Sequence, residues 1–163
     1  TGILYNKNRP AEIIKQLYDI AFLFDNMTDL TVVKNSYKKV VQEEIGFRKL
    51  DITAKEVLED TWQACYTLAE RNEKSADFKQ LQKGITNFTN FPIEQFNIDQ
   101  AIIAAAKVAY LTQLLQNEGE VKIVRFTNPL EIKDWSIEDT QYNKLNKLKK
   151  NNPEAFYYWY KAL

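Results

Sequence analysis

The sequence predicts a mainly all-α fold, a bundle of about five helices followed by a C-terminal arm. Before residue 120, four successive apolar stripes recur at helical spacing, each with a residue that commonly starts a helix. Four glycines and four prolines among 163 residues leave no long flexible linker, and no repeat is present. We therefore expect a helical bundle at 1–120 and, packed on it, an arm at 121–163 with one short extended segment and one or two more helices.

The first two helices are predicted between Pro10 and Gly46. Pro10 suits the first turn of a helix, and apolar residues then recur at helical spacing as far as Asp25. Thr28 is expected to cap the second helix, whose exposed face is rich in lysine and glutamate. Gly46 is expected to end that helix, because glycine readily adopts the left-handed conformation that follows many helices.

The next two helices are predicted from their caps. Thr53 and Glu56 have the spacing of a capping box, in which a hydroxyl and a carboxylate satisfy free backbone N–H groups. That helix is expected to run to about Arg71. Ser75 is expected to cap a fourth helix, which ends near Asn90 because a proline two residues later disfavours helix before it.

The remaining elements mix one long helix with an irregular tail. Small and apolar residues at 98–117 predict a closely packed helix that stops before Gly119. The segment VKIVRF, at 121–126, is expected to be extended, and a lone strand needs a partner from another element or chain. Ser136 is expected to cap a helix to about residue 150, and Pro153 to open a short aromatic one.

Composition excludes several kinds of chemistry. The 22 basic residues equal the 22 acidic ones, so no global field draws the chain to nucleic acid or to an anionic membrane. No histidine is present, which removes histidine bases and imidazole metal ligands, and the single Cys65 cannot form an internal disulfide. The longest apolar run is broken by Lys107, so no membrane contact is expected. We expect a reducing, cytoplasmic location. The chain opens at Thr1 and its one methionine is Met27, so we expect a fragment of a longer protein.

The segment IIKQLYDIAFLFD, at 13–25, carries the candidate site. Lys15, Asp19 and Asn26 fall within one narrow polar strip of the predicted helix, which is otherwise apolar around most of its circumference. One interpretation makes this strip a solvent face, with Lys15 and Asp19 as an ordinary i,i+4 ion pair. The other has the strip face a cleft or a second domain, where a carboxylate can hold a metal or accept a proton. Spacing alone does not decide between them.

The first 25 residues resemble the segment that follows the catalytic core in AbiEii-type nucleotidyltransferases, a family of abortive-infection and toxin–antitoxin proteins. Lys15, Tyr18 and Asp19 match the family pattern, whereas Gln16 stands where many members carry a first acid. The resemblance implies that Asp19, with Lys15, contributes late catalytic residues to a site built mainly by a preceding nucleotidyltransferase domain. The family's Asp-x-Asp metal motif has no counterpart in this sequence.

The resemblance also implies what the complete protein would need. A divalent cation, magnesium, and a nucleoside triphosphate are expected for the full-length enzyme, and no cofactor for this fragment, which is expected to be inactive alone. Implied partners are the chain's own N-terminal catalytic domain, a cognate antitoxin and an RNA acceptor. The alternative is a non-catalytic helical module that binds an antitoxin or another partner subunit.

A third hypothesis concerns the C-terminal arm. Lysines at 144–150 precede a run of aromatic residues at 156–160, a combination of cations and stacking surfaces that single-stranded nucleic-acid sites also use. The competing interpretation is a charged helix surface backed by aromatic core contacts.

Overall fold

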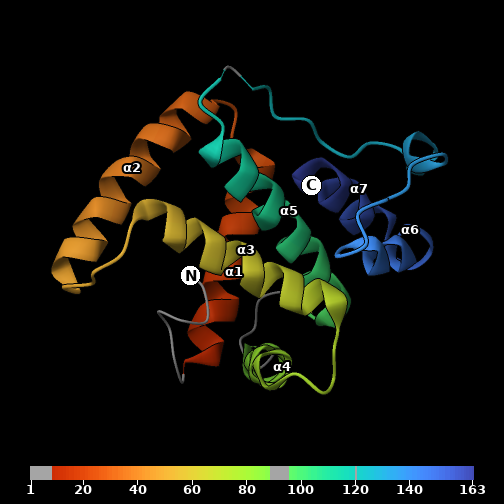
Figure 1. Ribbon diagram of the computed structural model, residues 1–163, viewed down its shortest axis with the longest axis horizontal. Helices are drawn as coiled ribbons and strands as arrows, with labels where there is room; N and C mark the ends of the chain where they lie inside the picture. The colour runs from red at the N-terminus through yellow and green to blue at the C-terminus, as the bar shows by residue number, and fades with distance from the viewer. Residues whose placement is uncertain (1–8, 89–95, 120) are drawn as a thin grey trace.

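The computed structural model describes residues 9–88, 96–119 and 121–163, and within them the protein is helical with no β-strand (Figure 1). The elements are α1 (Pro10–Asn26), α2 (Leu30–Phe47), α3 (Ala54–Glu70), α4 (Ala76–Phe88), α5 (Ile98–Gln116), η1 (Pro129–Ile132), η2 (Asn143–Lys147), α6 (Leu148–Asn151) and α7 (Pro153–Ala162). The predicted all-α fold class is confirmed.

The centre of the molecule is α5, which packs against α1, α3 and α7. Its alanines at 101, 104, 105, 106 and 109 are all buried, and such small side chains let neighbouring helix backbones approach closely. Among the described residues, α5 is the one helix long and apolar enough to cross a membrane, but 61% of its apolar window is buried inside the protein. Packing among three helices therefore accounts for its composition.

The helix α4 lies across the start of α1, and a glycine permits the contact. A Cβ at Gly84 would overlap the carbonyl oxygen of Pro10 and lie 2.8 Å from Cγ1 of Ile14. A glycine therefore suits this position because it lets two backbones approach each other. The predicted end of α4 near Asn90 falls outside the described residues, and the described helix extends to Phe88.

The C-terminal arm is held on α5 by aromatic side chains. Phe156, Tyr157, Tyr158 and Trp159 of α7 are buried, and the ring of Tyr158 stacks on that of Tyr110 of α5 with ring centroids 5.9 Å apart. The same ring meets that of Phe24 of α1 edge to face at 5.3 Å. The predicted extended segment at 121–126 forms no strand. Its backbone N–H groups at positions 124 and 126 donate to tyrosine hydroxyls of α5 and α7, so side chains replace the partner strand.

The arm departs from the prediction at 136–150, where one helix was expected. The structure instead has irregular chain to residue 142, then η2 and the short α6. The side-chain amide of Asn146 bonds both the backbone N–H and the C=O of Ile137, at 2.9 and 3.0 Å. Because these backbone groups are taken by a side chain, they are not available to a helix that would begin at Ser136.

The helix α2 stands apart from the rest. Its main contacts are with α3, and it lies on the opposite side of the molecule from α6 and α7 (Figure 1). Both of its predicted ends need correction. The N-cap is Asp29 and not Thr28, since the Asp29 carboxylate accepts bonds from the backbone N–H groups of Thr31 and Val32. The helix passes Gly46, and the left-handed residue that follows it is Lys49, with φ of 52°.

Candidate functional site: an apolar groove beside α2

The two predicted catalytic residues, Lys15 and Asp19, form an ion pair on the surface of α1. Lys15 Nζ lies 2.7 Å from Asp19 Oδ2, and their side chains are 59% and 48% exposed. The hydrogen bond and the charge of Asp19 raise the pKa of Lys15. Asn26, the third member of the strip, donates from its side-chain amide to the carbonyl oxygen of Phe22. The structure thus brings the predicted pair together on an exposed helix face, and their catalytic role stays a prediction.

The part of the chain that the structure describes contains neither a group of side chains suited to a metal ion nor an accessible thiol. No group of three or more Cys, Asp or Glu side chains there is arranged to hold a metal ion. Glu56 completes the predicted capping box, and hydrogen bonds from Thr53, the backbone N–H first, lower its pKa. Cys65 is buried, and burial raises the pKa of its thiol, which makes the reactive thiolate scarce.

The C-terminal lysines make contacts within the protein. Lys144 pairs with the carboxylate of Glu70 at 2.9 Å, and Lys147 donates to the backbone carbonyl of Glu70. Lys149 donates to two backbone carbonyls of the arm, those of Lys133 and Trp135. These contacts fasten the arm to α3 and to itself, so they favour the structural interpretation of the lysine–aromatic segment over a nucleic-acid site.

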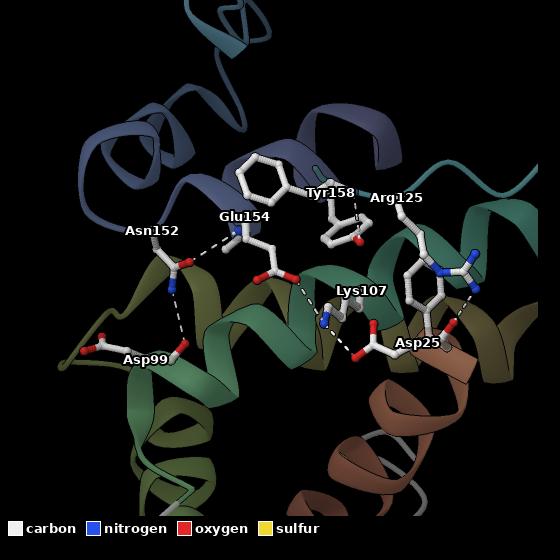
Figure 2. A network of polar contacts seen from close by, with 10 residues as sticks. Asp25, Asp99, Lys107, Arg125, Asn152, Glu154 and Tyr158 are labelled. Carbon is white, nitrogen blue, oxygen red and sulfur yellow. Dashed lines mark hydrogen bonds and ion pairs between the residues drawn. The ribbon is translucent and has the colours of Figure 1, made fainter. Parts of the chain in front are cut away.

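A polar network links the end of α1 to α5 and α7 (Figure 2). Lys107 of α5 bridges Asp25 of α1 at 2.8 Å and Glu154 of α7 at 3.0 Å, with its own side chain 12% exposed. Burial by itself lowers the pKa of Lys107, but the bonds and charges of the two carboxylates outweigh it and the pKa is raised. Arg125 donates to the carbonyl oxygens of Phe24 and Met27 at the end of α1. Every one of these contacts joins parts of the fold, which gives the network a structural role.

The remaining candidate is a groove that sequence reasoning missed. Side chains of α1, α2, α3 and α5 enclose a half-open cavity of about 730 Å³ between α2 and the bundle. Buried apolar residues of α1 and α5, among them Phe24, Val108 and Leu111, line its wall on the side of the bundle, and Val41 is a buried lining residue of α2 on the other wall. A concave apolar cavity of this size lies within the usual range of ligand sites in proteins.

Three hydroxyl groups and the charged groups of the groove are already engaged within the protein. The hydroxyls of Tyr37, Thr61 and Thr112 donate to backbone carbonyls at 2.9, 2.9 and 2.7 Å. The lining contains one acid and one base, Glu44 and Arg48, which pair with each other at 2.9 Å. Burial raises the pKa of Tyr37 to about 12. The groove therefore offers an apolar surface with no net charge.

Apolar residues continue from the groove onto its rims. Leu23 of α1 and Val32 and Val40 of α2 line the groove and are 63%, 59% and 56% exposed. At 100° per residue, Phe47, which is 86% exposed, falls on the same face of α2 as Val40. Such a clustered exposed patch is typical of an interaction site.

The groove also borders the polar strip of α1. Gln16, Leu23 and Asn26 line it, and they lie three residues before, four after and seven after Asp19. Residues at these spacings share one face of a helix. The ion pair of Lys15 and Asp19 is therefore next to the groove on α1.

One signal of the groove was present in the sequence. The apolar stripe of α2 can be recognised in the sequence, yet in the structure only Leu30 and Val41 of this helix are buried. Periodicity shows which face of a helix is apolar but not whether that face finds a partner within the chain.

The fold and the groove define an all-α protein with an open apolar groove between one outlying helix and the bundle. Comparison of the chain with protein-family models, with curated proteins and with solved structures gave no match. The resemblance to AbiEii-type nucleotidyltransferases therefore stays a prediction.

Proposed function

We propose that the protein is a helical interaction module that binds another protein through the groove beside α2. The observation that carries this proposal is the exposed apolar lining, since Leu23, Val32 and Val40 are each more than half exposed. Exposed apolar side chains have a free-energy cost in water, on the order of 25 cal/mol per Å² of apolar area, that an interface would remove. A partner protein such as an antitoxin or another subunit would supply the missing cover.

The shape of the patch supports a macromolecular partner. A small molecule would fill the cavity but leave uncovered two exposed rings outside its lining, Phe22 of α1 and Phe47 of α2, which are 61% and 86% exposed. Interfaces between proteins commonly have aromatic residues at their apolar centre and a polar rim around it. Phe22 follows Asp19 by three residues, so an exposed aromatic ring and the charged pair of Lys15 and Asp19 share one face of α1.

Site-specific photo-cross-linking in cells tests this proposal. A photoreactive residue is introduced at Val40 or Leu23 in the groove, or at Leu130, a 74% exposed residue of η1 outside it. The expected result is one protein cross-linked from both groove positions and not from the control position. That protein is then purified, and its affinity is expected to fall when Val40 is replaced by Asp. Equal cross-linking from all three positions would contradict the proposal.

A second candidate function, favoured by the exposure of Asp19, is the C-terminal helical domain of an AbiEii-like nucleotidyltransferase. Asp19 makes its ion pair on the surface of α1, where a preceding domain would have access to it. In that arrangement the carboxylate would help to hold the divalent cation that neutralises charge on the reacting phosphates. The full-length protein carrying Asp19→Asn is the test: loss of nucleotide transfer with unchanged folding supports this role, and retained transfer removes it.

A further inference from the structure

We infer that the occupant of the groove is the apolar face of an amphipathic α-helix from a different protein. This inference rests on the proposed interaction function and adds the chemistry of the partner. The competing occupants are an extended peptide, a fatty acyl chain and a second copy of this chain.

Hydrogen bonding separates a helix from an extended peptide. A helix satisfies its own backbone N–H and C=O groups, whereas an extended segment must find partners for them along the surface that it covers. The hydroxyls of Tyr37, Thr61 and Thr112 already donate within the protein, and the groove contains no sheet edge in the described residues. The other uncharged polar side chains of the lining are Gln16, Asn26 and Ser36, too few to pair the successive backbone groups of an extended segment. Backbone groups of an extended peptide would therefore be buried against apolar walls at a free-energy cost. A helix avoids this cost.

The walls of the groove also have the character of helix-packing surfaces. On one side, Val33, Tyr37, Val40 and Val41 form a stripe at the 3-4 spacing of a helix face, and α1 and α5 provide the opposite wall. Ridges of side chains at this spacing pack against the grooves of another helix. The inserted helix would lie between α2 and the bundle and would give α2 the second packing partner that its stripe lacks.

A second copy of this chain has no suitable helix to offer from its described residues. The helices α1, α3, α4, α5 and α7 bury their apolar stripes within the molecule. The stripe of α2 already forms one wall of the groove. A different protein is therefore the better source.

Charge predicts how the partner binds. The pairs Glu44–Arg48 and Lys15–Asp19 neutralise the charges at the groove and beside it. Salt screens interactions between unpaired surface charges but affects apolar burial little. The affinity should therefore change less than about threefold between roughly 50 and 500 mM salt.

Two peptide-display libraries of equal composition provide the experiment. One places apolar residues at i, i+3, i+4 and i+7, and the other at every second position. Peptides selected on the whole chain are synthesised, and their affinities are measured for the unaltered protein, for Val40→Asp and Leu23→Asp on opposite walls, and for Leu130→Asp as the control. Far-ultraviolet circular dichroism and urea unfolding establish that each variant is folded. Palmitate is tested alongside as the acyl-chain probe.

The expected result is a set of peptides from the helix-patterned library that become helical on binding. Their affinity should fall at least about tenfold in both groove variants and remain unchanged in Leu130→Asp. Groove binding only by the strand-patterned library would overturn the helix and leave the proposed interaction function intact. Binding of palmitate alone, or no ligand sensitive to the groove variants, would overturn both. A dimer of the chain that the groove variants dissolve would overturn the choice of a different protein.

Discussion

Two glycines in helices provide a paired test of the packing. A Cβ at Gly84 of α4 would overlap the Pro10 carbonyl and crowd Ile14, whereas one at Gly46 of α2 would meet no atom within 4 Å. Substitution of each glycine by alanine therefore introduces the same methyl group into a crowded and into an open environment. We expect opposite effects on the free energy of unfolding.

The size of the difference follows from two terms. Alanine favours a helix over glycine by about 0.8–1 kcal/mol, a gain that both variants share, reduced for Gly46 by its place in the last turn of α2. Only Gly84→Ala adds an overpacking cost, typically about 1–3 kcal/mol. The new Cβ would overlap the backbone carbonyl oxygen of Pro10, which cannot rotate away as the end of a side chain can. Because Gly46→Ala gains less helix propensity than Gly84→Ala, the two terms together make Gly84→Ala less stable than Gly46→Ala by up to about 3 kcal/mol.

Urea unfolding of both variants and the unaltered chain, followed by far-ultraviolet circular dichroism, measures this difference. Gly46→Ala serves as the control for helix propensity. If Gly84→Ala were as stable as Gly46→Ala, then α4 would not approach the start of α1 as described, and the packing that orients α1 toward the groove would be in error.

The further predictions concern three ionisable groups. Asp19→Asn should leave the urea midpoint nearly unchanged, because the pair with Lys15 is exposed and such pairs contribute little. Lys107→Met should lower the free energy of unfolding by about 1–2 kcal/mol, measured by urea unfolding, because it removes charge-assisted bonds that hold α7; an unchanged value would contradict this. The Lys107 contribution should persist below pH 10.5 and fade as the pH rises through its raised pKa. Spectrophotometric titration should find Tyr37 ionising near pH 12 rather than 10.0. The free energy of unfolding should fall as the pH rises between these values, and this part of the fall should be absent from Tyr37→Phe.

Local signals predicted the helices well where the structure is decided by neighbours in sequence. Pro10 and Pro153 open helices, and Thr53 with Glu56 forms the capping box that their spacing indicates. The end of α2 was wrong because Lys49 adopts the left-handed conformation that glycine usually takes. Its N–H and that of the following residue bond back to the last turn of α2, which satisfies free carbonyls there.

Features that depend on distant residues could not be predicted in this way. The helix expected from Ser136 fails because Asn146 holds the backbone of Ile137. The groove depends on how α2 is placed relative to α1 and α5, and contacts distant in sequence, such as the bond from Tyr37 to the carbonyl of Ala54, join α2 to α3. Periodicity of one helix contains no information on such contacts. The i,i+4 spacing of Lys15 and Asp19 gave an exposed ion pair as one of two interpretations, whereas the place of Asp19 beside the groove required the fold.

The most direct test of the groove as a binding site is the location of a bound helix. Nuclear Overhauser effects are measured between the leucine methyl groups of the tightest helix-patterned peptide and the methyl groups of the whole chain. We predict contacts from one peptide face to Val40 of α2 and to Leu111 of α5 at the same time, since these residues line opposite walls. Contacts confined to the lysine-rich outer face of α2, or to surfaces outside the groove, would contradict the account.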